Sequence, residues 1–181
     1  AAARRSAADG KTAIYVAAAN ATADRLPGYY ALARRKGYNA IVVDFKDDLG
    51  QVTYDTSLGF PRAIGAVEPM IDAPALIAGA HDRGLYLIAR IVVFKDRVLY
   101  RAEGYRYALW DSDRNRPWGV FRTVTDEDSG ESRTVQVEHW VDPNLPAVWE
   151  YNVSIAEELA ALGVDEIQFD YIRFPSDLSL I

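Results

Sequence analysis

The amino-acid sequence predicts an α/β fold in which strands and helices alternate and the strands form a parallel sheet. Short apolar runs rich in β-branched residues recur along the chain, for example at 40–45. Stretches with helical periodicity separate these runs, and a glycine follows each helical stretch. Continuous apolar strands are typical of parallel sheets that helices cover. Because helices that join parallel strands form right-handed crossovers, two architectures fit, a doubly wound sheet and a β/α barrel.

Each predicted element has its own local signal. Asp72 is placed as a helix N-cap, with Pro74 in the first turn, and Gly37, Gly84 and Gly163 stop the three helices. The clearest helical stripe lies at 146–162, where apolar residues recur every three or four positions. The expected strands cover 12–19, 40–45, 85–94 and 165–172, and the expected helices cover 26–36, 75–83 and 146–162.

Two long connections, 46–70 and 95–145, interrupt this rhythm. Both follow the C-terminal ends of strands, which is the side on which β/α folds build their ligand sites. Connections of this length are usually functional or contain structure of their own. In the second connection, strand-like segments at 119–125 and 133–140 flank an acidic, glycine-containing segment, so we expect a hairpin there.

Composition limits the class of protein. The 181 residues are 50% hydrophobic and suffice for one domain with a sizeable core. A net charge of −6 argues against nucleic acid as a partner, because phosphate binding needs a concentrated basic face. The sequence has no cysteine and two histidines, which excludes a thiolate site and argues against a zinc cluster, so we expect no metal and no cofactor.

The N-terminal segment 1–11 is read as a linker or a processed mature end, because it lacks the apolar centre of a signal peptide. No apolar run approaches the roughly 18 residues that a membrane span requires. Of the possible locations, an extracytoplasmic one, periplasmic or secreted, is favoured.

Carboxylates at strand ends are the main candidates for chemistry. Alternate residues of a strand share a face, so Glu166, Gln168 and Asp170 point the same way from the fourth expected strand. Glu166 lies deeper in the strand and is expected to join a structural network more readily than to act directly. Asp170 lies at the C-terminal end, which favours catalysis or ligand binding.

The same alternation places Asp44 and Lys46 on one face as the second strand ends. Arg90 is a permanent cation within the third strand and must meet an anion. We expect its partner to be Asp44 or Asp170, whose pKa it would lower so that the acid stays ionised as a nucleophile or base.

Other polar residues carry weaker signals. Asp47 and Asp48 suggest calcium ligands, but their spacing matches no complete EF-hand loop. Asp48 is better read as a solvated turn residue, and Asp47 remains open between the two readings. His139 is expected to be structural, and His81 to cap the second helix without a functional role.

Three tryptophans of the long loop are candidates for sugar contacts, because flat rings stack against sugar faces. They are open between loop packing and substrate contact: Trp110, Trp118 and Trp140. Serine-hydrolase, nucleotide-binding and zinc-protease motifs do not occur, which leaves carboxylate chemistry.

The string from Asp165 to Pro175, DEIQFDYIRFP, resembles the signature of a bacterial glycosyl-hydrolase-like family long catalogued as a domain of unknown function. The likeness extends to WEYNVSIA at 149–156, NAIVVDFKDD at 39–48, IARIVVFKD at 88–96 and WVDP at 140–143. It implies a TIM-like barrel and a role in polysaccharide breakdown, hence a carbohydrate substrate.

The fourth strand is also similar to that of the alpha-amylase superfamily, where an Asp at the position of Asp170 acts as the nucleophile. Gln168 departs from the Arg of that superfamily, and Arg90 is a hypothetical replacement for its charge. We therefore expect Asp170, Asp44 and Arg90 to be catalytic. The expected substrate-binding residues are Lys46, Asp47, Gln168, Glu166, Trp118, Trp140, Tyr171 and Arg173.

A β/α barrel typically takes about 250 residues. The expected fold is therefore a partial β/α barrel over 12–181, with the first four strand-and-helix units and an excursion at about 95–145. Glycoside hydrolysis normally uses two carboxyl groups. If Asp170 is one, the second would come from a later strand, so the rest of the barrel or another chain is an expected partner.

Three hypotheses follow. The first is a glycoside hydrolase that acts on a polysaccharide with Asp170 as nucleophile or base. The second is a non-catalytic carbohydrate-binding or structural module within a larger assembly. The third, which has less support, is a metal-dependent hydrolase that uses Asp44, Asp47 and Asp170.

Overall fold

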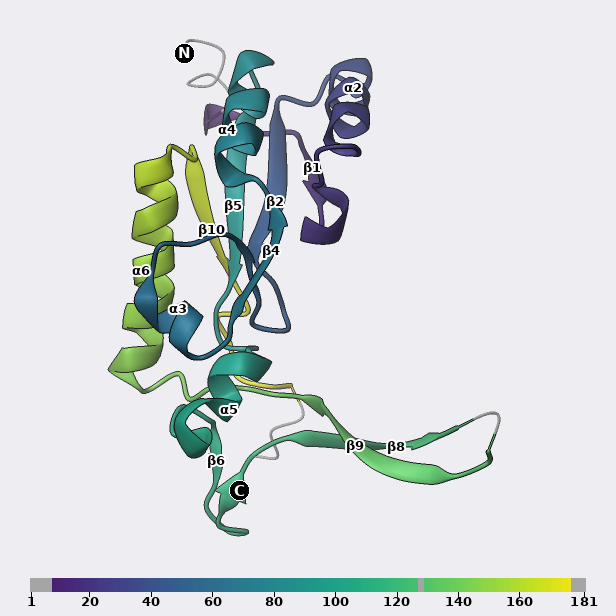
Figure 1. The fold of residues 1–181 in the computed structure, drawn as a ribbon, viewed down its shortest axis with the longest axis vertical. Coiled ribbons are helices and arrows are strands. Elements are labelled where there is room, and N and C mark those ends of the chain that lie inside the picture. Colours follow the sequence, from purple (N-terminus) through teal and green to yellow (C-terminus); the bar gives the residue numbers. More distant parts are fainter. Residues whose placement is uncertain (1–7, 127–128, 177–181) are drawn as a thin grey trace.

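The structure, a computed structural model, describes residues 8–126 and 129–176. Its centre is a parallel sheet whose strands run side by side (Figure 1). From one edge to the other, these strands are β1 (Ala13–Val16), β2 (Ala40–Lys46), β5 (Tyr86–Val92) and β10 (Glu166–Asp170).

The order of the strands decides between the two architectures. Each strand pairs with the strand of the preceding unit, so the sheet grows in one direction along the chain. A doubly wound sheet reverses its order at a switch point, whereas a barrel does not. The fold is therefore that of four consecutive units of a β/α barrel, and the predicted fold class is confirmed.

Three helices pack on one face of this sheet and bury one hydrophobic core. They are α2 (Leu26–Lys36), α4 (Ala73–Asp82) and α6 (Pro146–Leu162). α2 and α6 have the predicted bounds, and the predicted stops Gly37 and Gly163 have left-handed backbones with φ of 73° and 105°. Asp72 caps α4 as predicted, because its carboxylate accepts a hydrogen bond from the Ala75 amide at 3.0 Å.

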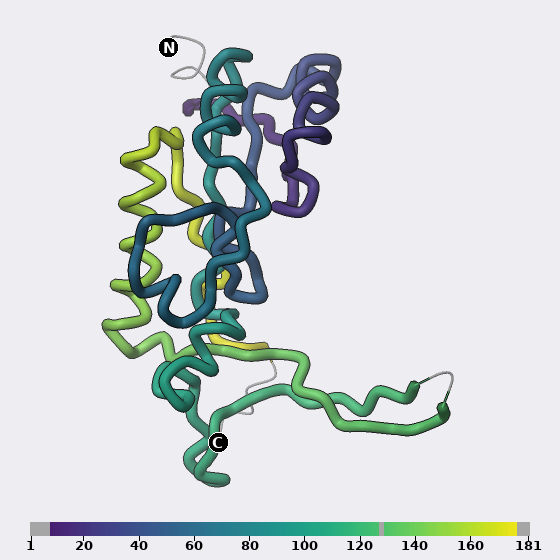
Figure 2. The backbone as a smooth tube through the Cα atoms, viewed as in Figure 1, coloured from purple at the N-terminus to yellow at the C-terminus, as the bar shows by residue number. Residues whose placement is uncertain are grey.

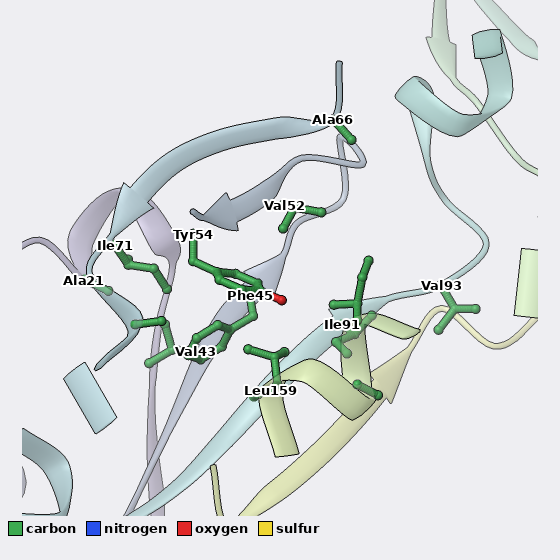
Figure 3. Packing of buried hydrophobic residues seen from close by; sticks show 14 of the residues in the cluster. Ala21, Val43, Phe45, Val52, Tyr54, Ala66, Ile71, Ile91, Val93 and Leu159 are labelled. Carbon is green, nitrogen blue, oxygen red and sulfur yellow. The ribbon is translucent and has the colours of Figure 1, made fainter. Parts of the chain in front are cut away.

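The core lies between the sheet and these helices (Figure 3). Val43, Phe45 and Ile91 point from neighbouring strands toward Leu159 of α6, and all four are fully buried. The rings of Phe45 and Tyr54 meet edge to face at 5.7 Å. Because alternate strand residues face the helices, the intervening residues, Asp44 and Arg90 among them, face the opposite side.

The first long connection contains structure that the sequence analysis did not assign. It forms β3 (Val52–Tyr54), α3 (Gly59–Ala63) and β4 (Val67–Ile71). β3 runs antiparallel to β2, and β4 runs parallel to β3. Glu158 of α6 fixes this excursion, because it accepts hydrogen bonds from the Tyr54 hydroxyl at 2.6 Å and the Ser57 amide at 2.7 Å.

The second long connection holds the predicted hairpin, formed by β8 (Val120–Thr125) and β9 (Ser132–Glu138). The hairpin projects from the body of the molecule (Figures 1 and 2). The connection also contains α5 (Arg97–Tyr105), β6 (Trp110–Asp111) and β7 (Arg116–Pro117), and a 3-10 turn, η1 (Ala18–Asn20), follows β1. No helix in the described ranges is long and apolar enough to cross a membrane.

Candidate active site

Arg90 binds two carboxylates on the face of the sheet away from the helices. Its Nη1 donates to Asp44 Oδ1 at 2.7 Å, while its Nε donates to Asp170 Oδ2 at 2.7 Å. Its Nη2 also lies 2.6 Å from Asp170 Oδ2. The two alternative partners expected from the sequence are thus both partners, and one guanidinium joins three neighbouring strands.

Strand register explains why these residues meet. Asp44 of β2 lies directly across from Arg90 of β5, and Arg90 lies across from Gln168 of β10. Asp170 is two residues further along β10 and therefore on the same face as Gln168. The long side chain of Arg90 reaches across to Asp170 at the strand's C-terminal end.

Tyr15 of β1 completes the site, and the sequence analysis missed it. Its hydroxyl donates to Asp44 Oδ2 at 2.5 Å, and its ring lies 5.8 Å from the Arg90 guanidinium carbon. Partial burial, with the hydrogen bond to Asp44, raises the pKa of Tyr15 to about 12, so the hydroxyl stays protonated at neutral pH. The missed signal was strand alternation. Tyr15 pairs with Val42 of β2, which lies on the same face of the sheet as Asp44.

The two carboxylates differ in accessibility. The Asp44 side chain is 6% exposed and the Asp170 side chain is 39% exposed. Burial raises the pKa of Asp170, but hydrogen bonds from the Tyr171 amide and Arg90 outweigh it, and the pKa lies below its usual value. Asp170 is therefore an ionised carboxylate that a ligand can reach, whereas Asp44 is largely covered.

The guanidinium of Arg90 is a fixed cation. Partial burial lowers its pKa, but hydrogen bonds to Asp44 and Asp170 raise it by more, so the net shift is upward. Because both carboxylates are bound through charge-assisted hydrogen bonds, their orientations are set before any ligand arrives.

Glu166 and Gln168 lie nearer the start of β10. Glu166 forms an ion pair with Lys11 and accepts a hydrogen bond from the Tyr86 hydroxyl at 3.1 Å, which is the structural network expected for it. It is four residues, or about 13 Å of strand, from Asp170. Gln168 is exposed and shares the face of Asp170.

Lys46 was expected to lie on the same strand face as Asp44, and this expectation was wrong. A register irregularity separates the two residues in β2. The Lys46 side chain is fully buried, with Nζ 2.8 Å from Asp96 Oδ2 and donating to the Val92 carbonyl at 2.5 Å. A ligand at the sheet face does not meet this ammonium group.

Asp47 forms a turn. Its Oδ1 accepts hydrogen bonds from the amides of Leu49 and Gln51, both at 2.9 Å. Burial raises its pKa, although these hydrogen bonds oppose the shift. Asp48 lies 3.2 Å from the ammonium of Lys95, so it is an ion-paired turn residue.

The loop tryptophans take different positions. Trp140 is 1% exposed, and its indole Nε1 donates to Glu138 at 2.9 Å, so it packs inside the loop and the expected sugar contact does not fit. Trp118 is partly buried against the core. Trp110, by contrast, is 50% exposed.

Tyr171 and Arg173 follow β10. Tyr171 adopts a left-handed backbone, with φ of 54°, which is unusual for a bulky residue and occurs often at functional sites. Its ring lies 5.3 Å from the Lys95 ammonium and 5.2 Å from the Arg173 guanidinium, and it packs on Trp140 at 5.8 Å. The residue directly after Asp170 therefore has a strained backbone.

Neither histidine belongs to the site. His139 lies 3.2 Å from Arg101, and burial with the nearby arginines lowers its pKa to about 4, so it is neutral at neutral pH. His81 does not simply cap its helix as expected, because its Nε2 lies 3.0 Å from Oδ2 of Asp165, the residue just before β10.

Metal chemistry receives no support from the geometry. Among residues 8–126 and 129–176, no group of three or more His, Asp or Glu side chains could hold a metal ion. Arg90 lies between Asp44 and Asp170, and Asp47 binds backbone amides, so the three acids considered for a metal-dependent hydrolase are not gathered as ligands.

The fold and the site together define a β/α-barrel protein with carboxylates at its strand ends, the arrangement of glycoside hydrolases. The chain belongs to the family described as "Putative glycosyl hydrolase domain", which matches residues 13–180. No curated protein matches the chain.

Solved structures extend this relation. A hypothetical protein from Ruminiclostridium thermocellum is 34% identical, with a TM-score of 0.74 over 90% of this chain and 77% of that one. An alpha-amylase from Lactobacillus plantarum (16% identity, TM-score 0.54) and a noncanonic maltogenic alpha-amylase from Thermotoga neapolitana (17%, 0.55) share the fold alone. The two matches include 88% and 90% of this chain but only 38% and 39% of the two amylases.

Proposed function

We propose that the chain supplies the Asp170 half of a glycoside hydrolase site that acts on a polysaccharide, with Asp170 as nucleophile or base. The observation that carries this proposal is the pair Arg90 and Asp170. The carboxylate is ionised, oriented by the guanidinium and the Tyr171 amide, and 39% exposed at the end of a barrel strand.

The other residues of the site have supporting roles in this proposal. Asp44 holds Arg90 from the opposite side, and Tyr15 occupies the remaining oxygen of Asp44. Both are positioning residues, because they reach Asp170 only through the guanidinium. Gln168, exposed on the same face, is proposed to contact the sugar together with Tyr171 and Arg173.

Hydrolysis requires a second carboxyl group, about 5 to 5.5 Å from Asp170 for a retaining enzyme and about 6.5 to 9.5 Å for an inverting one. Asp44 is a poor proton donor to a ligand, since its side chain is 6% exposed and both of its oxygens are occupied by Arg90 and Tyr15. We therefore assign the proton donor to a carboxyl group that faces Asp170 from outside the described sheet.

The test is the release of reducing sugar from a panel of polysaccharides by the full protein and its Asp170→Asn variant. We expect hydrolysis to be lost in the variant while its melting temperature is retained. Asp113→Asn is the matched control, because Asp113 is an exposed aspartate on the loop between β6 and β7. Equal turnover by Asp170→Asn and Asp113→Asn would remove Asp170 from the mechanism.

A second candidate function is a non-catalytic carbohydrate-binding or structural module in a larger assembly. The observation that favours it is an apolar groove of about 510 Å³ beside β10 and α6. Trp149, Phe169, Ile172 and Phe174 in this groove are 41% to 60% exposed. Sugar binding without turnover, unchanged in Asp170→Asn, would support this function over the first.

A further inference from the structure

A groove lined by arginines lies between α2 and α4, at the end of the sheet remote from Asp170. Its volume is about 890 Å³. Tyr38 and Leu85 precede β2 and β5, so the groove adjoins the strands' N-terminal ends, whereas Asp170 lies at a C-terminal end. A seven-residue strand separates the two ends by about 20 Å. The polar and aromatic residues that line the groove are Tyr30, Arg34, Arg35, Tyr38, Asp82 and Arg83.

Arg83 is held in place by neutral groups. Its guanidinium carbon lies 4.6 Å from the centre of the Tyr30 ring, and its Nη1 donates to the Gly79 carbonyl at 2.8 Å. Tyr30 is itself fixed, because it is buried and its hydroxyl donates to the Leu76 carbonyl at 3.3 Å. The guanidinium is thus held in place, and no carboxylate of the described residues forms an ion pair with it.

Arg34 and Arg35 add two further positive charges from the last turn of α2. Within residues 8–126 and 129–176, none of the three arginines of the groove forms an ion pair. Asp82 is the one acid among the lining residues. Three arginines without an ion pair, against one acid, therefore gather in one groove of a protein whose net charge is −6, so the groove attracts anions.

We propose that this groove binds an acidic oligosaccharide, a sugar chain that carries carboxylate groups, as a second binding site remote from Asp170. The choice of a sugar rests on the proposed function. A guanidinium binds a carboxylate through two parallel hydrogen bonds, and the partly exposed ring of Tyr38 lines the same groove and can contact a sugar ring. Arg83 is ordered before binding, so little side-chain entropy is lost there.

The test is calorimetric titration of the full protein with tetragalacturonic acid, and with cellotetraose as a neutral oligosaccharide of equal length. We expect the acidic chain to bind at least about tenfold more tightly, and its affinity to fall as salt screens the arginines. The double variant Arg34→Gln/Arg35→Gln and the single variant Arg83→Gln should each weaken binding about tenfold.

Arg122→Gln is the matched control, because it removes one exposed charge from the distant hairpin and should leave the affinity unchanged. Binding should also persist in Asp170→Asn, so a failure of the catalytic proposal leaves this site testable. Equal binding of the neutral chain, or full affinity in both groove variants, would overturn the proposal. So would tighter binding of a single-stranded oligonucleotide that the same substitutions abolish.

Discussion

Replacement of Arg90 by Gln should destabilise the protein in a pH-dependent way. The substitution removes the only cation bound to Asp44 in the described ranges, and the Asp44 side chain is 6% exposed. It also removes the guanidinium from Asp170, whose side chain is 39% exposed and well screened by water.

The magnitude follows from these exposures. Loss of one partner of a buried ion pair costs about 3–5 kcal/mol, but Arg90 is 15% exposed, so we expect about 2–3 kcal/mol, nearly all of it from Asp44. For a chain of this length, that corresponds to a fall in melting temperature of about 5–10 °C.

The pH dependence has a definite sign. The folded-state pKa of Asp170 lies below its usual value, so its interaction with Arg90 adds stability above about pH 4 and loses it as the pH falls through the lowered pKa. The Asp170 part of the difference between wild type and Arg90→Gln should therefore be present at neutral pH and shrink toward pH 3, while the larger Asp44 part sets the fall in melting temperature at neutral pH. Thermal melts by circular dichroism at both pH values measure it, with Arg122→Gln as control. A fall of less than about 2 °C at neutral pH would show that Arg90 does not stabilise the fold through Asp44.

Three further outcomes follow from the structure. Lys46→Met should lower the free energy of unfolding by about 3–5 kcal/mol in denaturant titrations, because it leaves the fully buried Asp96 without its cation; an unchanged midpoint would contradict the ion pair. Gly50→Ala should cost at least about 2 kcal/mol by the same measurement, because φ is +85° and the added Cβ would lie 1.9 Å from Asp96 Oδ1; a neutral effect would show that this approach is wrong. Burial and nearby arginines lower the pKa of His139 to about 4, so its side chain should cost stability as the pH falls from about 6.5 to 4, and its NMR signals should not titrate between pH 5 and 8; a midpoint near 6.5 would show an exposed ring.

The regular elements were predictable because their signals are local. α2 and α6 combine an apolar stripe with a glycine stop, and both have the predicted bounds. The hairpin of β8 and β9 was also predicted. α3 and α5 were not, since they are short and depend on tertiary contacts, and the backbone of α5 departs from helical geometry at Ala102, Glu103 and Gly104.

The site was predictable as far as strand alternation holds. Asp44, Arg90 and Asp170 meet because their strands are in regular register. Lys46 was misplaced because an irregularity after Asp44 breaks the alternation, and no sequence signal marks it. Trp140 was misread because its burial depends on how the loop folds back on itself, which periodicity does not report.

Chemical rescue of Asp170→Gly by azide tests the role of Asp170 most directly, on a polysaccharide that the wild-type protein hydrolyses. A nucleophile or base at Asp170 predicts a loss of turnover of about 10³-fold or more, and partial recovery when azide, a small anion, occupies the space of the missing carboxylate. Turnover by Asp170→Gly that remains close to wild type without azide would contradict the assignment.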